Sequence, residues 1–270
     1  NLYISNKIMK KSFYFLVSTV LFLSACTSSS DKSVIDSETI DSSAYVNTSD
    51  QNIVFPSPLQ VASIFRKSGL LYIDNITNDA NQLNQYESQI SKSLNFGVYS
   101  ADLAYSVLNG QKQKSIDYLK CVKKLSNDLG ISSIFNAENL FQSFEKNISQ
   151  EDSLIQILSV VQEKLDDHLQ NSESEHMGTI YFVGGWVEAM YMGTRVLESS
   201  DNIQLTQHLM EQSALLELIM RALKVNPYRE DPILVSISSK LQALNEMVYS
   251  FEYIKNRNID EIPLEINQYN

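Results

Sequence analysis

Two long segments that are almost free of charge constrain the fold of this chain more than any other feature. Asp102 is the only charged residue between Lys92 and Lys112, and Glu188 is the only one in residues 177–194. A helix that is apolar on all sides must be buried in a protein core or in a membrane. Glycines and Glu188 in the second segment argue against membrane insertion. We therefore predict two central helices, residues 96–108 and 177–194, buried within one helical domain.

The remaining helices are predicted from apolar side chains spaced three and four residues apart. Ser57 and Pro58 suit the start of the first helix, and Ser149 with Asp152 approximates a capping box. No segment alternates between apolar and polar residues as a strand does. The sequence therefore predicts an all-α domain of about eight or nine helices. Apart from the central pair, its main helical segments are residues 79–94, 111–129, 149–169, 205–223 and 232–251.

Gly184 and Gly185 stand side by side inside the second central helix. An interior glycine costs a helix about 1 kcal/mol relative to alanine. The pair therefore predicts a close approach of another backbone, a kink, or the start of a helix at this point.

The N-terminal region has the pattern of a secretory signal peptide followed by a lipid-attachment cysteine. Lys10 and Lys11 precede an apolar run, residues 13–23, which is too short to span a membrane. The string Leu23-Ser24-Ala25-Cys26 resembles the lipobox of bacterial lipoproteins, which implies that Cys26 carries acyl chains such as palmitate and becomes the new N-terminus. The Thr27 that follows favours the outer membrane over the inner one under this resemblance.

Four regions follow from these patterns. Residues 1–25 comprise upstream residues before Met9 and the signal peptide, and residues 26–54 form a tether rich in Ser, Thr and Asp. The helical domain is predicted to span residues 55–258. Residues 259–270 form a loosely attached C-terminal tail.

Charge and cysteine content exclude some classes of function. Without residues 1–25 the chain carries 18 basic and 32 acidic side chains, a formal charge of −14. Phosphate backbones repel such a domain, so nucleic acid is not expected as a partner. If Cys26 is lipidated, Cys121 is the only other cysteine, which rules out an intramolecular disulfide. Its apolar helical neighbours predict a buried structural thiol.

A faint internal repeat relates the two central helices. A shift of 86 residues aligns Phe96 with Phe182, and two further pairs of identical or similar residues follow, Asp102 with Glu188 and Tyr105 with Tyr191. The alignment suggests two related half-domains. Acid and tyrosine three residues apart share a helix face. The two acids therefore either meet across the bundle or serve as separate hydrogen-bonded structural groups.

Candidate ligand-binding residues lie on these two helices. Aromatic side chains with one polar end suit a pocket but equally suit a core, and the candidates are Tyr99, Asp102, Tyr105, Trp186, Glu188 and Tyr191. Paired carboxylates could bind a metal, but bundle metal sites add histidine where this chain has tyrosine. No phosphate loop, nucleophile elbow or paired-cysteine motif occurs. No metal, cofactor or catalytic residue is therefore predicted.

Several strings also resemble a group of uncharacterised helical lipoproteins of Bacteroidota. They are the Phe55-Pro56-Ser57-Pro58 string, residues 96–105, Tyr118-Leu119, Leu129-Gly130, and Gly184-Gly185-Trp186-Val187-Glu188. This resemblance implies a cell-envelope location and a helical fold, with the periplasmic or surface side left open. It implies no activity.

The function expected from the sequence is that of a lipid-anchored envelope protein that binds another envelope protein or a small ligand. The alternative is an enzyme or metal-dependent protein that uses Asp102 and Glu188. The absence of catalytic motifs favours the binding module.

Overall fold

A computed structural model describes residues 55–136, 139–198 and 200–250 of the chain. Within these ranges every regular element is helical and no strand occurs, so the predicted all-α fold is confirmed. The described residues belong to one compact unit. The predicted signal peptide, Cys26, the tether and the C-terminal tail lie outside them.

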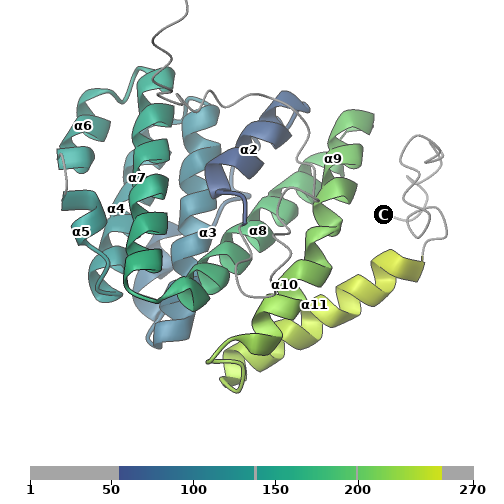
Figure 1. Ribbon diagram of the computed structural model, residues 1–270. Coiled ribbons are helices and arrows are strands. Elements are labelled where there is room, and N and C mark those ends of the chain that lie inside the picture. The colour runs from purple at the N-terminus through teal and green to yellow at the C-terminus, as the bar shows by residue number, and fades with distance from the viewer. Residues whose placement is uncertain (1–54, 137–138, 199, 251–270) are drawn as a thin grey trace, which may run out of the picture. The chain divides into compact units, whose positions relative to one another are not determined.

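Ten α-helices and one 3₁₀ helix make up the described part of the chain (Figure 1). They are α2 (Pro58–Lys67), η3 (Ala80–Gln85), α3 (Gln89–Leu108), α4 (Lys112–Asp128), α5 (Ser133–Asn136), α6 (Leu140–Lys146), α7 (Glu151–Asn171), α8 (Glu175–Leu197), α9 (Ile203–Ser213), α10 (Leu215–Val225) and α11 (Pro232–Ser250).

The start of α2 follows the predicted capping pattern. The Ser57 side chain accepts a hydrogen bond from the Gln60 N–H at 3.2 Å, and the Gln60 side chain accepts one from the Ser57 N–H at 2.7 Å. The predicted cap of α7 is wrong. Its N-cap is Gln150, and the Ser149 hydroxyl accepts a hydrogen bond from Lys112 at 2.9 Å instead. Asp152 lacks the long side chain that would complete a capping box.

The predicted outer helix over residues 79–94 is also wrong. Asp79 caps the short η3, the chain turns extended at Tyr86, and Ser88 caps the new helix α3. The second half of the predicted outer helix and the first central helix are thus one element. The helix predicted over residues 205–223 divides instead, because Ala214 separates α9 from α10. Side-chain caps at Asp79 and Ser88 decided the first boundary, whereas no side-chain cap marks the division at Ala214. The apolar spacing continues across both.

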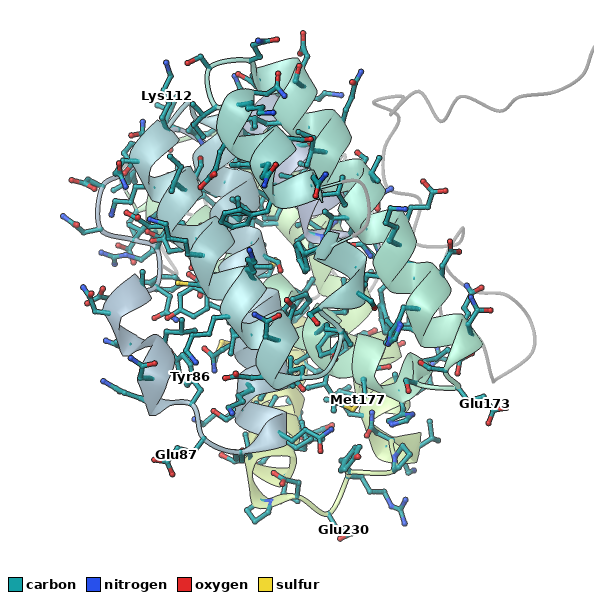
Figure 2. The ribbon with its side chains drawn as sticks, turned by 90° about the vertical axis from the view of Figure 1, so that its left-hand side faces the viewer. Tyr86, Glu87, Lys112, Glu173, Met177 and Glu230 are labelled. Carbon is teal, nitrogen blue, oxygen red and sulfur yellow. The ribbon has the colours of Figure 1, made fainter. Side chains whose placement is uncertain are left out.

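The helices α3 and α8 form the centre of the described domain and contact each other more extensively than any other pair. Figure 1 shows α4, α5, α6 and α7 on one side of them and α9, α10 and α11 on the other. Figure 2 shows the start of α3, near Glu87, and the turn between α7 and α8, at Glu173, toward one end. The start of α4, at Lys112, lies toward the opposite end. Both predicted central helices are therefore confirmed as buried elements.

Glycines allow α3 and α8 to approach closely, as the Gly184-Gly185 pair predicts. A Cβ atom added at Gly184 would lie well under 3.0 Å from the Leu94 carbonyl oxygen, and one at Gly97 would overlap the Tyr181 carbonyl. Real Cβ atoms essentially never come so close to backbone, so any larger residue must push the helices apart. We refer to the contact of Leu94, Gly97, Tyr181, Gly184 and Gly185 as the glycine crossing.

No helix in the described ranges combines the length and the apolar character that crossing a membrane requires.

Candidate functional site

Three of the candidates lie on α3, and their side chains form hydrogen bonds with the loop of residues 71–79. The Tyr105 hydroxyl donates a hydrogen bond to the Leu71 carbonyl at 2.9 Å and accepts one from the Ile73 N–H at 2.7 Å. Tyr105 is 1% exposed, whereas Leu71 is 67% exposed, so a core tyrosine reaches a loop that lies partly at the surface. Tyr105 thereby fixes the first part of the loop on α3.

Tyr99 and Asp102 fix the second part of the same loop. The Tyr99 hydroxyl donates to the Asp79 carbonyl at 2.9 Å, and Asp102 Oδ2 accepts from the Asn78 N–H at 3.2 Å. Tyr99, Asp102 and Tyr105 are spaced three residues apart and so follow one side of α3. Together they form what we call the loop clamp, which holds residues 71–79.

Tyr118 on α4 completes this attachment, and the candidates chosen from the sequence did not include it. Its hydroxyl lies 2.6 Å from Thr77 Oγ1 and 3.0 Å from the Asn78 carbonyl oxygen, so it can accept from the first and donate to the second. The buried Tyr118 follows α4 with the periodicity of an ordinary core residue. Its partners are backbone and threonine groups that no sequence motif marks.

The two acids of the central helices do meet. Asp102 is fully buried, and the partly buried Glu188 of α8 interacts with it. Burial, followed by the negative charge of Glu188, raises the pKa of Asp102, while burial raises the pKa of Glu188 to about 7. The two carboxyl groups lie within hydrogen-bonding reach of each other, and Asp102 Oδ1 is buried with no other partner in the described structure. A single proton held between the acids relieves their repulsion.

We expect this carboxyl pair to make the protein less stable as the pH rises. Between about pH 4.5 and pH 7 the folded protein retains a proton that the unfolded chain releases. The free energy of unfolding therefore falls with pH, by up to about 1.4 kcal/mol per pH unit for one proton. Glu188→Gln removes the group whose pKa burial raises, so it should flatten the slope.

Urea unfolding at pH 5 and pH 8 measures this effect, with Asp117→Asn as the control. Asp117 is a substantially exposed acid of α4, and its replacement should leave the slope at the wild-type value. An equal slope in the Glu188→Gln variant and the wild type would show that the buried pair does not bind the proton.

The position of Asp102 limits what the pair can do chemically. Asp102 is 0% exposed and lies beneath the clamped loop, so a substrate reaches it only if residues 71–79 move. Neither acid lines any of the three cavities described below. In the described ranges no group of three or more His, Cys, Asp or Glu side chains is placed to hold a metal ion. Two carboxylates alone are a sparse ligand set for a metal.

The α8 candidates lie in different surroundings from one another. Trp186 is 2% exposed in the core, and its indole N–H is buried without a hydrogen-bond partner in the described structure. Tyr191, by contrast, is 47% exposed. Tyr105 and Tyr191 align in the internal repeat, yet one is a buried clamp residue and the other a surface residue. None of the six candidates lines any of the three cavities described below.

Cys121 is a buried free thiol in α4, as its apolar neighbours predict. Burial raises its pKa to about 11, so the sulfur stays protonated at neutral pH. A protonated buried thiol acts as a small apolar side chain.

A mainly apolar cavity of about 200 Å³ lies where α7 packs over α3 and α8, and the sequence candidates did not include it. We call it the α7 pocket. Its lining residues are Phe55, Pro56, Pro58, Phe96, Gly97, Ser100, Gln162, Leu165, Asp166, Leu169, Gln170, Glu175, Gly178, Thr179, Tyr181 and Phe182. A smaller apolar cavity of about 50 Å³ shares several of these residues and lies nearer the start of α7.

Two aromatic pairs form much of the α7 pocket wall. Phe55 stacks on Phe182 with ring centroids 4.1 Å apart, and Phe96 packs against Tyr181 at 5.0 Å. Gly97 and Ser100 lie three residues apart on α3, and Gly178 and Thr179 are neighbours on α8. The glycines do not open the pocket, because a Cβ at Gly97 would meet the α8 backbone and one at Gly178 would meet the Leu169 side chain. No sequence pattern marks the site, because its lining comes from four separate segments of the chain.

A more polar cleft of about 790 Å³ lies between the clamped loop and α4. Three lysines line it, but each has an acidic partner: Lys114 with Asp74 at 3.8 Å, Lys120 with Asp117 at 3.8 Å, and Lys124 with Asp128 at 3.3 Å. These pairs cancel much of the positive charge that an anionic ligand would need. The cleft therefore favours no particular class of ligand.

Comparison with known proteins assigns no family or function to the chain. No protein-family model, curated protein or solved structure matches the chain. The resemblance to helical lipoproteins of Bacteroidota accordingly stays a prediction from the sequence.

Proposed function

We propose that this protein is a lipid-anchored module of the cell envelope that binds a small, mainly apolar ligand in the α7 pocket. The observation that supports the binding role is the pocket itself, a concave site with aromatic walls and a few polar groups, as is typical of ligand sites. The anchoring role rests on the lipobox-like string that ends at Cys26, and membrane fractionation of a Cys26→Ser variant tests it.

The size of the α7 pocket indicates the size of the ligand. An apolar cavity of about 150 Å³ inside a protein is enough to hold benzene. At about 200 Å³ the α7 pocket suits one ring with a short side chain. Gly97 belongs to both the glycine crossing and the pocket lining, so part of the pocket wall is rigid before any ligand binds. A preformed wall avoids much of the ordering cost of binding.

We expect 2-phenylethanol to bind the protein with a Kd of about 1 mM or lower, which corresponds to about 4 kcal/mol of binding free energy. Ser100→Phe should abolish binding, because the added ring would occupy the pocket. The only hydrogen bond that the Ser100 hydroxyl donates is to the Phe96 carbonyl in its own helix, so its loss should cost little stability. Ligand-observed NMR measures the binding, and circular dichroism checks the fold.

Ser236→Phe is the matched control for this experiment. Ser236 is exposed on α11, and the same substitution there leaves the α7 pocket unchanged. The proposal requires that Ser236→Phe bind the probe like the wild type. A probe that fails to bind the wild type, or that binds a folded Ser100→Phe variant equally well, contradicts it.

The alternative is an enzyme that uses Asp102 and Glu188. The meeting of two acids with raised pKa values favours it, because such pairs serve acid-base catalysis in other proteins. The full burial of Asp102 beneath the loop clamp is the reason we place it second.

A further inference from the structure

We propose that the α7 pocket selects a small organic cation, a ligand that carries an ammonium group on an apolar body. This inference rests on the proposed binding function and adds the charge of the ligand. It is drawn from two features of the lining, its charge and its aromatic rings.

The charge of the lining is entirely negative. Among its sixteen residues, Asp166 and Glu175 are acidic and none is Lys or Arg. Both acids are exposed, which places them where the polar end of a ligand would meet solvent. An anionic ligand would find repulsion and no positive partner in this lining. A cationic group would be attracted by both carboxylates.

Neither acid is neutralised by its immediate partners. Asp166 accepts a hydrogen bond from the uncharged amide of Gln162 at 2.9 Å. Glu175 is the first residue of α8, where the positive end of the helix dipole weakens its field but leaves the negative charge in place. Burial raises the pKa of Asp166, against the opposing effect of the Gln162 hydrogen bond, so its attraction for a cation is greatest toward the upper end of the neutral pH range.

Aromatic rings supply a second attraction for a cation. Phe55, Phe96, Tyr181 and Phe182 all line the pocket, and the face of an aromatic ring attracts ammonium groups electrostatically. A neutral ligand of the same shape gains the apolar contacts but not this attraction. Rings and carboxylates together therefore favour a cation over its neutral analogue.

The test compares three probes that share a phenyl ring and differ in charge: 2-phenylethylamine, 2-phenylethanol and phenylacetate. An exposed carboxylate near the ligand should contribute about a three- to fivefold change in Kd. We expect the amine to bind the full chain about tenfold more tightly than the alcohol, and phenylacetate to bind more weakly than either. Raising the salt concentration should weaken amine binding and leave alcohol binding almost unchanged.

Substitution identifies the groups that recognise the charge. Asp166→Asn combined with Glu175→Gln should weaken amine binding about tenfold and leave the Kd of the alcohol within a factor of two. Asp152→Asn is the control, because Asp152 is an exposed acid in the first turn of α7 that does not line the pocket. It removes a charge from the same helix and should leave all three Kd values close to wild type.

The outcomes separate this inference from the proposed function. If the alcohol binds and the amine binds no more tightly, cation selection is refuted and the binding function stands. If none of the three probes binds, both proposals are refuted. An amine preference that survives in the double variant would refute the role assigned to Asp166 and Glu175.

Discussion

Gly184→Ala is expected to destabilise the protein by about 3 kcal/mol or more. The new Cβ atom would overlap the Leu94 carbonyl oxygen at the glycine crossing, and backbone cannot give way as a flexible side chain can. Overpacking a dense core costs about 1–3 kcal/mol, and a backbone clash at the contact of the two central helices belongs at the upper end of this range. The midpoint of urea unfolding, with the slope m unchanged, measures the effect.

Gly178→Ala in the same helix is the matched control. A Cβ atom there meets only the Leu169 side chain, at 3.0 Å, and alanine favours the helix by about 1 kcal/mol. We expect its stability to lie within about 1 kcal/mol of wild type. Equal stability of the Gly184→Ala and Gly178→Ala variants would mean that the glycine crossing is not tightly packed.

Tyr105→Phe is expected to destabilise the protein by about 1–3 kcal/mol. Loss of the hydroxyl leaves the partly buried Ile73 N–H without its partner, and an unsatisfied buried polar group costs about 1–3 kcal/mol. The Leu71 carbonyl belongs to a residue that is 67% exposed, so water can replace the hydroxyl there. Residues 71–79 should also exchange their amide hydrogens faster, because the loop clamp holds them on α3. Urea unfolding and hydrogen exchange measure the two effects.

Tyr191→Phe is the natural comparison, because Tyr191 aligns with Tyr105 in the internal repeat. Tyr191 is 47% exposed, so loss of its hydroxyl should change stability by no more than about 0.5 kcal/mol. Similar effects of the two substitutions would contradict the loop clamp. A large effect of Tyr105→Phe alone would show that the repeat in sequence does not extend to the role of its tyrosines.

The glycine crossing connects the fold to the proposed site. Gly97 contacts α8 through its backbone and also lines the α7 pocket. The pocket thus lies beside the close contact of α3 and α8, two core helices that carry three of its four aromatic residues. A site built on such helices keeps its shape better than one built on loops.

Much of the architecture was determined by the sequence alone. Lack of charge in residues 96–108 and 177–194 required burial, because no helix face was left for water. Ser57 and Pro58 are typical of a helix start and predicted the beginning of α2. The Gly184-Gly185 pair predicted a close contact with another backbone. Each of these inferences depends on groups that lie near one another along the chain.

The contacts of the candidate residues depended on tertiary structure more than the positions of the helices did. The sequence placed Tyr99, Asp102 and Tyr105 on one helix, but it could not show that their partners are backbone groups of residues 71–79. It raised the meeting of Asp102 and Glu188 as one of two possibilities, and packing of α3 on α8 decided it.

The α7 pocket was decided by tertiary structure alone. A cavity is space that side chains from several helices fail to fill, and apolar spacing along one helix does not report that space. The sequence therefore determined which helices had to be buried, because burial follows from each helix's own side chains. Only the tertiary structure decided what lies between them, because that depends on how the shapes of separate helices fit together.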